Sequence, residues 1–448
     1  MTVPAAESSP RPVARVRGPV VASVRSPGSK SLTNRFLILA ALCRGEGVLR
    51  HPLASDDTDR LLAAIETLGL IVRPEGPVVR IDGGDGRFPG GGGIDLGAGG
   101  TPTRFMIAAA TRARLAVTID GSPRMRERPI AEGVALVEAI GGRVDWLDRR
   151  GHLPVRVHPA EPLEGGDLEV ARTASSQFVS ALLLVAPTTR RGVRVRFTES
   201  PTSPTYLELT IDALRRVGIE PAVERDSAGG LASIAVSPGV IPTFDVEIEP
   251  DASSAVYPAM LAAAVPGSRV ELPGLPADSV QPDAAAIDAL AAFGATVERR
   301  ADRAIVAHAG PLRGVDLDAS DFPDAAVGLA ALAALAEGPS RFRGLHTLRV
   351  KECDRVAALA TELRRLGCVV EEGPDTLEIE PVGPGPVDDS AATVRIARWD
   401  DHRMAMAFAI VGAVRGGVEV DDPGCVAKSH PGFWDELDRL GAGADPVP

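Results

Sequence analysis

A helix pattern that ends in glycine recurs six times along the chain. Each time, an Ala- and Leu-rich stretch runs into a glycine and then into a Val-rich stretch, as in ALVEAIGGRVDW and ELRRLGCVVEE. A glycine directly after the last helical turn is a common stop signal, because it adopts the left-handed conformation without strain. The six glycines lie 72 to 77 residues apart, at Gly69, Gly141, Gly218, Gly294, Gly367 and Gly441.

A second series of helices has nearly the same period and is strongly apolar. Its members begin near Ser31, Thr101, Ser175, Ser253, Phe322 and Asp401. A helix that is apolar on all sides is usually buried on all sides. Each repeat reads strand, helix, strand, helix and two strands, which predicts an α/β protein built from six similar units.

The six units divide into two domains of three, since 448 residues are too many for one ordinary core. A stretch with two prolines, IPTFDVEIEP at 241–250, lies near the junction of units three and four. We therefore expect an N-terminal domain over 25–247. The C-terminal domain is expected over 248–448 together with 14–24, and residues 1–13 are expected to be a flexible tail.

The composition excludes several classes of protein. The net charge is -12 and no basic run occurs, which argues against nucleic-acid or anionic-membrane partners. No apolar stretch reaches 18 residues, and the N-terminus lacks the apolar segment of a secretory signal. The four cysteines are scattered without metal-binding spacing. We expect a cytoplasmic monomer with reduced thiols, no metal and no cofactor.

Charged and hydroxyl side chains concentrate at the helix starts, where free N–H groups and the helix dipole favour anions. Eight cations lie at such starts or turns, in both halves of the chain: Lys30, Arg35, Arg104, Arg124, Lys351, Arg355, Arg403 and Lys428. Ser175, Ser176 and Gln177 open another helix and offer a neutral cradle for phosphate. The pattern indicates small substrates with several negative charges.

Two carboxylates lie among these cations. Asp324 enters an otherwise apolar helix, where it is either a helix cap or a base with a pKa tuned by its surroundings. Glu352 lies beside Lys351 and Arg355, which share one helical face at i and i+4 if this segment is a helix. This segment is either a salt-bridged surface or part of a proton-transfer site.

Seven motifs together resemble one known family. PGSKSLTNR, GSPRMRERPI, SSQF, PDAA, VKECDR, DDHRMAMAF and DPGCVAKS occur in the order and spacing of the 5-enolpyruvylshikimate-3-phosphate synthases (3-phosphoshikimate 1-carboxyvinyltransferases), over 19–434. The resemblance implies two inverse α/β domains, each of three βαβαββ units. It also implies transfer of the enolpyruvyl group of phosphoenolpyruvate to the 5-hydroxyl of shikimate 3-phosphate, in the shikimate pathway.

The resemblance also implies a role for each site residue. Lys30 and Gln177 would contact both substrates. Shikimate 3-phosphate would be held by Ser31, Arg35, Ser175, Ser176, Ser203, Asp324 and Lys351. Phosphoenolpyruvate, and the inhibitor glyphosate in its place, would be held by Gly100, Arg124, Arg355, Arg403 and Lys428. Asp324 would take the proton of the attacking hydroxyl, Glu352 would protonate the methylene carbon, and Lys30 would assist catalysis.

Two other functions are weighed against this one. The sister enzymes that use UDP-N-acetylglucosamine normally carry a reactive Cys in the loop corresponding to 123–129, and none is present here. A non-catalytic clamp would need a basic inner surface and no acid/base pair. The chain also departs from its own family at Ala98, Phe105 and Thr347, where Asn, Pro and Asn are usual.

Overall fold

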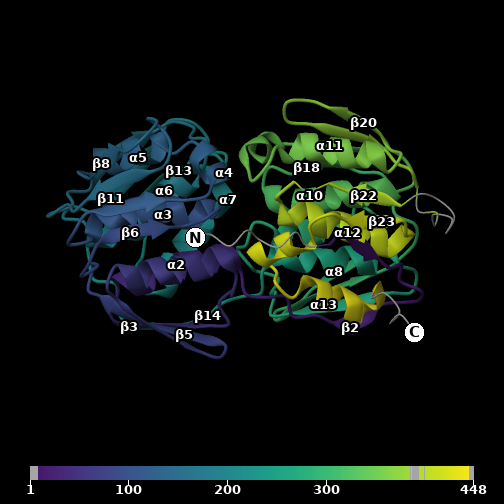
Figure 1. Cartoon of the computed structure of the whole chain (residues 1–448), viewed down its shortest axis with the longest axis horizontal. Helices are drawn as coiled ribbons and strands as arrows, with labels where there is room; N and C mark the ends of the chain where they lie inside the picture. Colours follow the sequence, from purple (N-terminus) through teal and green to yellow (C-terminus); the bar gives the residue numbers. More distant parts are fainter. Residues whose placement is uncertain (1–8, 384, 386–392, 398, 443–448) are drawn as a thin grey trace. The chain divides into compact units, whose positions relative to one another are not determined.

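The computed structural model describes residues 9–383, 385, 393–397 and 399–442. These form two compact units (Figure 1). The central unit is Gly28–Glu249, and the flanking unit combines the residues up to Pro27 with those from Pro250. The chain thus passes between units at 27/28 and 249/250, where the sequence had placed the changes at 24/25 and 247/248.

The central unit contains three four-stranded sheets, one for each repeat. In each sheet an edge strand pairs in parallel with its neighbour, and the other strands are antiparallel. The sheets are β14 (Phe244–Glu247), β3 (Arg44–Arg50), β5 (Val78–Gly84) and β4 (Ile71–Glu75); β6 (Gly92–Asp95), β7 (Val117–Asp120), β9 (Val155–His158) and β8 (Arg143–Trp146); and β10 (Gly166–Val170), β11 (Val193–Phe197), β13 (Leu231–Val236) and β12 (Ala222–Arg225).

Three interior helices of the central unit pack against one another: α1 (Lys30–Leu42), α3 (Gly100–Ala109) and α6 (Gln177–Val185). Figure 1 shows α3 and α6 lying side by side. Every residue of α1 from Leu32 to Leu42 is buried, as its apolar sequence predicts. The remaining helices are α2 (Asp56–Thr67), α4 (Pro123–Glu127), α5 (Ala131–Ala139) and α7 (Pro204–Arg216).

The flanking unit repeats this plan. Its sheets are β2 (Val21–Ser23), β15 (Arg269–Pro273), β17 (Arg303–Ala307) and β16 (Thr296–Arg299); β18 (Asp316–Asp318), β19 (Ser340–Arg343), β21 (Leu377–Glu380) and β20 (Val369–Glu372); and β1 (Arg11–Val13), β23 (Val418–Val420) and β22 (Val394–Ile396). Its interior helices are α8 (Ala252–Ala264), α10 (Pro323–Leu332) and α12 (His402–Arg415). Its other helices are α9 (Ala284–Ala289), α11 (Arg355–Arg365) and α13 (Phe433–Leu437).

The repeat predicted from the sequence is confirmed, with one difference in how the sheets are completed. All six repeat glycines have φ between 81° and 101°. However, the parallel partner of β3 is β14, from the end of the central unit, and the parallel partner of β15 is β2, from the N-terminal segment. The expectation of a flexible tail is wrong for residues 11–13, because they form β1 and pair with β23; residues 1–8 lie outside the described residues.

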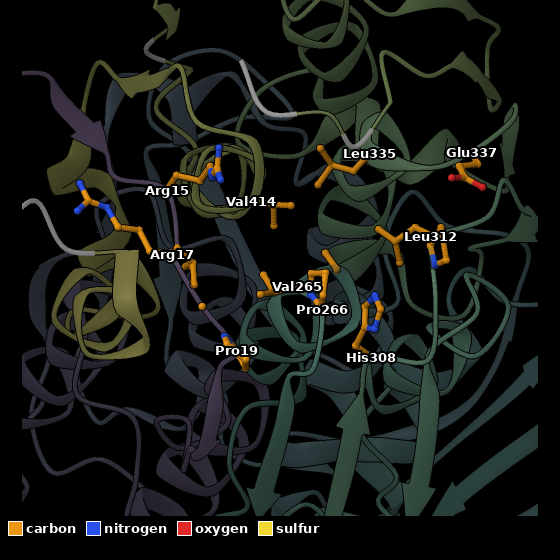
Figure 2. Close-up of a pocket in the computed structure, with 14 residues that line it drawn as sticks. Arg15, Arg17, Pro19, Val265, Pro266, His308, Leu312, Leu335, Glu337 and Val414 are labelled. Atoms are coloured by element: carbon orange, nitrogen blue, oxygen red, sulfur yellow. The ribbon is translucent and has the colours of Figure 1, made fainter. Parts of the chain in front are cut away.

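A cavity of about 550 Å³ lies in the flanking unit at the carboxyl ends of its interior helices. Ala264 ends α8 there, and Val414 lies in the last turn of α12. Figure 2 shows apolar side chains around its middle, with Arg15 and Arg17 to one side and Glu337 to the other. The predicted site residues of this unit lie around the starts of α10, α11 and α12 and in the turn at 423–428, and none of them lines this cavity.

Candidate active site

Most of the predicted site residues gather in two clusters, one in each unit, around the starts of helices α1, α3, α6, α10, α11 and α12. In the central unit, Ser29 caps α1 by accepting from the backbone N–H of Leu32, and Lys30 is the first helical residue. The Nζ atom of Lys30 lies 3.5 Å from Oδ2 of Asp57, and both side chains are largely buried. Asp57, in the first turn of α2, therefore holds this lysine, and the sequence interpretation had not included it.

Arg35 is 1% exposed and is held by uncharged oxygens. Its guanidinium donates to Oγ1 of Thr210 and to the carbonyls of Ser31 and Tyr206, each at 2.9 Å. Burial lowers the pKa of Arg35 to about 10, and Tyr206 only partly opposes this. Within the described residues, Arg35 has no carboxylate partner at ion-pair distance. It connects α1 with α7, and a direct contact with substrate stays a prediction.

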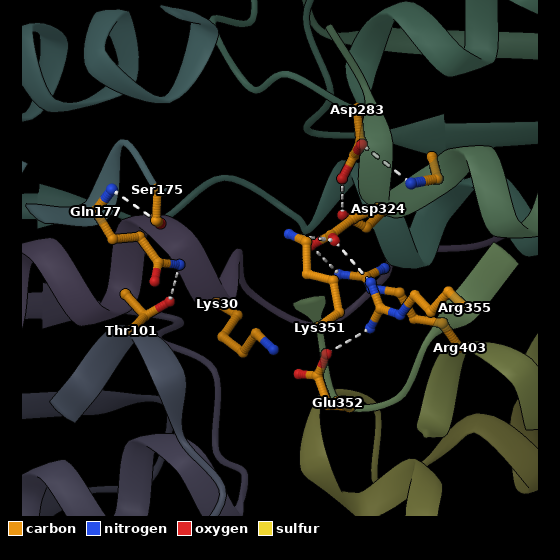
Figure 3. Close-up of polar contacts among 12 residues, drawn as sticks. Lys30, Thr101, Ser175, Gln177, Asp283, Asp324, Lys351, Glu352, Arg355 and Arg403 are labelled. Carbon is orange, nitrogen blue, oxygen red and sulfur yellow. Dashed lines mark hydrogen bonds and ion pairs between the residues drawn. The ribbon is translucent and has the colours of Figure 1, made fainter. Parts of the chain in front are cut away.

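Gln177 joins the starts of α3 and α6 (Figure 3). Its Nε2 donates to Oγ1 of Thr101 at 2.8 Å, and its Oε1 accepts from Nη1 of Arg104 at 2.6 Å. Its backbone N–H donates to Oγ of Ser175 at 3.3 Å. Ser176 is the N-cap residue of α6 and is buried. The structure thus brings the predicted phosphate cradle together and adds Thr101 and Arg104 to it.

Ser203 lies apart from these hydrogen bonds. It precedes α7 as the N-cap residue, with a positive φ of 47° and no capping hydrogen bond from its side chain. A non-glycine residue in this conformation is uncommon and is found more often at functional sites. The predicted contact of Ser203 with substrate stays a prediction.

The structure places Arg128, rather than the predicted Arg124, next to Gly100. The Arg124 side chain is 44% exposed and pairs with Glu127 at 2.7 Å. Arg128, directly after α4, is 7% exposed, and a Cβ on Gly100 would come within 2.6 Å of its Nη1. Glycine at position 100 therefore lets the Arg128 guanidinium approach the start of α3. The sequence showed three arginines at alternate positions, which does not reveal which one turns inward.

In the flanking unit, Arg355 is the centre of an ion-pair network. It begins α11 and is 1% exposed. Its guanidinium contacts Asp401 at 2.7 Å, Asp324 at 2.9 Å and Glu352 at 2.9 Å. Burial alone would lower the pKa of Arg355, but Asp401, Glu352 and Asp324 outweigh it and hold the pKa well above its usual range. Asp401, which caps α12, is a member of the site that the sequence interpretation had left out.

Asp324 contacts three cations from different parts of the flanking unit. Its Oδ1 lies 3.2 Å from Lys351 and 2.9 Å from Arg355, and its Oδ2 lies 3.0 Å from Arg403. Burial would raise the pKa of Asp324, but these three cations hold it well below its usual range. The Asp324 carboxylate is therefore ionised and already paired (Figure 3).

Glu352 bridges two of the predicted phosphoenolpyruvate ligands. Its Oε2 accepts from Nη2 of Arg355 and its Oε1 from Nζ of Lys428, both at 2.9 Å. The Glu352 and Lys428 side chains are 12% and 11% exposed. Glu352 and Asp324 thus share Arg355 but differ in their other partners, as an acid and a base with separate roles require.

The described part of the chain contains no group of three or more His, Cys, Asp or Glu side chains that could hold a metal ion. All four cysteines are free. None of the helices within the described ranges is long and apolar enough to cross a membrane.

The chain is similar to known proteins over almost its whole length. The model of the family described as EPSP synthase (3-phosphoshikimate 1-carboxyvinyltransferase) matches residues 14–437. A 3-phosphoshikimate 1-carboxyvinyltransferase of Cellvibrio japonicus is 39% identical over 435 residues, covering 96% of this chain and 98% of the relative. Another, of Thiobacillus denitrificans, is 40% identical over 425 residues, covering 93% and 96%.

Solved structures share the fold. An EPSP synthase from Acinetobacter baumannii superimposes with a TM-score of 0.79 at 23% identity, covering 97% of this chain and 99% of that one. The enolpyruvyl transferase NikO from Streptomyces tendae gives a TM-score of 0.74 at 19% identity, covering 97% and 98%. These likenesses confirm the predicted α/β fold of two three-repeat units.

Proposed function

Because the chain belongs to the EPSP synthase (3-phosphoshikimate 1-carboxyvinyltransferase) family, we propose that its two helix-start clusters supply the residues that bind both substrates and move protons. The enzyme transfers the enolpyruvyl group of phosphoenolpyruvate to the 5-hydroxyl of shikimate 3-phosphate and releases phosphate. The assignment of individual residues below is our proposal.

Shikimate 3-phosphate is bound chiefly by hydroxyls and N–H groups of the central unit. Ser175, Ser176 and Gln177 lie at the start of α6, where free N–H groups and the helix dipole favour a phosphate. Ser31 and Ser203 add hydroxyls. Arg35 supports this site indirectly, because its hydrogen bond to the Ser31 carbonyl fixes the first turn of α1.

Phosphoenolpyruvate is bound by cations that carboxylates already hold in place. These are Arg355, Arg403 and Lys428, and we also assign Lys30 to this substrate. We assign to Arg128 the role that the sequence had given to Arg124, because Arg128 is the arginine buried against Gly100. These cations are held before the reaction, so they stabilise the charge that develops on the leaving phosphate without reorganising.

The two carboxylates divide the proton transfers. Glu352 protonates the methylene carbon, which makes C2 an oxocarbenium-like centre that the 5-hydroxyl attacks. Asp324 accepts the proton of that hydroxyl. While three cations hold Asp324 it is a weak base, so anionic substrates that draw these cations away raise its pKa and make it a better proton acceptor. The tetrahedral adduct then expels phosphate, which takes the proton held by Asp324, while the adduct's methyl group returns a proton to Glu352, leaving the enol ether product.

One observation carries this assignment: Asp324 and Glu352 share the buried cation Arg355, while each has a further cation of its own. A coupled phosphate-release assay with phosphoenolpyruvate and either shikimate 3-phosphate or UDP-N-acetylglucosamine tests it. The assignment is supported if phosphate is released when the acceptor is shikimate 3-phosphate but not when it is UDP-N-acetylglucosamine, and if this release is lost in Glu352→Gln and Asp324→Asn. Unchanged release in both variants would remove these residues from the mechanism.

We also propose that the enzyme works as a cytoplasmic monomer. The free state of all four cysteines is compatible with a reducing compartment. Light scattering coupled to size-exclusion chromatography tests the oligomeric state, since a monomer should give the 46.5 kDa of the chain. Cell fractionation tests the compartment.

A further inference from the structure

A buried carboxyl group next to the proposed base has no role in the scheme above. Asp283 lies directly before α9 and is 3% exposed. Its carboxylate makes two hydrogen bonds, at the starts of two interior helices (Figure 3). One oxygen accepts from the hydroxyl of Ser253 in α8, and the other accepts from the backbone N–H of Ala325 in α10 at 3.1 Å.

The contact with Ala325 replaces a cap that α10 cannot make for itself. The N-cap residue of α10 is Phe322, which has no side-chain acceptor, and Pro323 follows it without an N–H. The other two interior helices of the flanking unit are capped by their own N-cap residues. Asp251 accepts from Ser254 in α8, and Asp401 accepts from Arg403 in α12. Only α10, of these three, takes its capping carboxylate from elsewhere in the sequence.

The N–H group that Asp283 binds belongs to the residue directly after Asp324. We infer that Asp283 is a positioning residue, which caps α10 in place of Phe322 and thereby fixes the Asp324 carboxylate against its cations. This inference rests on the proposed role of Asp324 as the proton acceptor. The Asp324 contacts with Lys351 at 3.2 Å and Arg403 at 3.0 Å depend on where the first turn of α10 lies.

The surroundings of Asp283 indicate that the cap needs its oxygens rather than its charge. The neutral Ser253 faces it from α8, the Asp324 carboxylate from α10 and the Arg403 guanidinium from α12. Burial and then Asp324 raise the pKa of Asp283 to about 6, against the opposing effect of Arg403. A protonated carboxyl still offers one acceptor oxygen, so the Ala325 N–H remains satisfied in either state.

The test compares variants that keep or remove the acceptor. Asp283→Asn keeps an oxygen for Ala325 and should retain kcat within about threefold, whereas Asp283→Ala should lower kcat about 10- to 100-fold, as expected for a reacting group displaced by about 1 Å. Asp283→Leu, similar in shape to Asp, serves if the Ala variant does not fold. Asp251→Ala is the matched control, because it removes the cap of the neighbouring α8, which carries no reacting group.

Two further measurements make the result decisive. In an Asp324→Asn background, Asp283→Ala should cause no further loss of kcat, since its effect passes through Asp324. Equal losses of kcat in Asp283→Asn and Asp283→Ala, or unchanged kcat in the Ala and Leu variants, would overturn the inference. If Asp324→Asn alone left kcat unchanged, the proposed base would be wrong, and this result is independent of what Asp283 does.

Discussion

The two clusters occupy similar places in similar folds, yet they hold their buried arginines in different ways. In the central cluster, Arg35 is bound by hydroxyl and carbonyl oxygens, and Arg104 donates to an amide oxygen. In the flanking cluster, Arg355 and Arg403 are bound by carboxylates. The difference teaches that one repeat plan can supply either a cradle for anions or a charge-balanced site for proton transfer, depending on which acceptors lie at the helix starts.

Removing the buried arginine of each cluster should destabilise the protein to different extents. Arg355→Met leaves three carboxylates close together without their shared cation, and should cost about 3–5 kcal/mol of unfolding free energy. Arg35→Met leaves only neutral oxygens unsatisfied and should cost about 1–3 kcal/mol. Urea denaturation of both variants measures this. Equal losses would show that the carboxylates do not set the flanking cluster apart.

The acid of the flanking cluster should matter more to turnover than to substrate binding. Glu352→Gln keeps the size of the side chain and one acceptor oxygen but removes the transferable proton. We expect kcat to fall at least about 100-fold. The Kd for shikimate 3-phosphate, measured by calorimetry, should change less than about threefold, because Ser175 and Gln177 remain. Near-normal turnover would contradict the assignment of Glu352.

Arg124 and Arg128, two of the three arginines in the segment around α4, sharpen the comparison within the central cluster. Arg128→Gln should raise the KM for phosphoenolpyruvate about 10-fold or more, the effect of losing a charge-assisted hydrogen bond. Arg124→Gln removes an exposed ion pair and should change KM less than about threefold. Steady-state kinetics at fixed shikimate 3-phosphate measures both. The reverse order would restore the role first predicted for Arg124.

The smallest expected effect concerns stability against pH. The folded protein holds the pKa of Asp283 at about 6, above the value of about 4 in an unfolded chain. Between these values the folded state binds a proton that the unfolded state does not, so this group makes the protein less stable as pH rises from about 4 to 6. Asp283→Asn should remove that slope. Denaturation curves at several pH values would show it, and an unchanged slope would contradict the raised pKa.

The sequence was sufficient to predict features that depend on local pattern. The period of glycines such as Gly141 and Gly367 revealed the repeat, because each glycine ends a helix by its own conformation. The motif VKECDR likewise indicated that Lys351, Glu352 and Arg355 lie close together, because these residues are within five positions of one another in the sequence. The pairing of β2 with β15 and of β14 with β3 was not predicted, because each pair joins segments that are distant in the sequence and a short strand does not encode its partner.

The details that were missed depend on three-dimensional proximity. Arg124 lies within the short helix α4, whereas Arg128 directly follows that helix in an extended conformation, where its side chain packs against Gly100. Asp283 caps a helix that starts 40 residues later in the chain, so neither segment alone signals the contact. A cap supplied from a distance can be suspected only where, as at Phe322, the local cap is absent.

The division of the chain at Pro27 and Glu249 has a consequence for biosynthesis. Gly28–Glu249 is continuous, and its last strand, β14, completes its first sheet, so this unit can fold once about 250 residues have left the ribosome. The N-terminal strands β1 and β2 emerge first, but their partners β23 and β15 are made later. During synthesis these two strands are open edges that wait for their partners. Release of the chain before β23 is made would leave β1 unpaired, so early termination should produce a folded central unit with an aggregation-prone N-terminus.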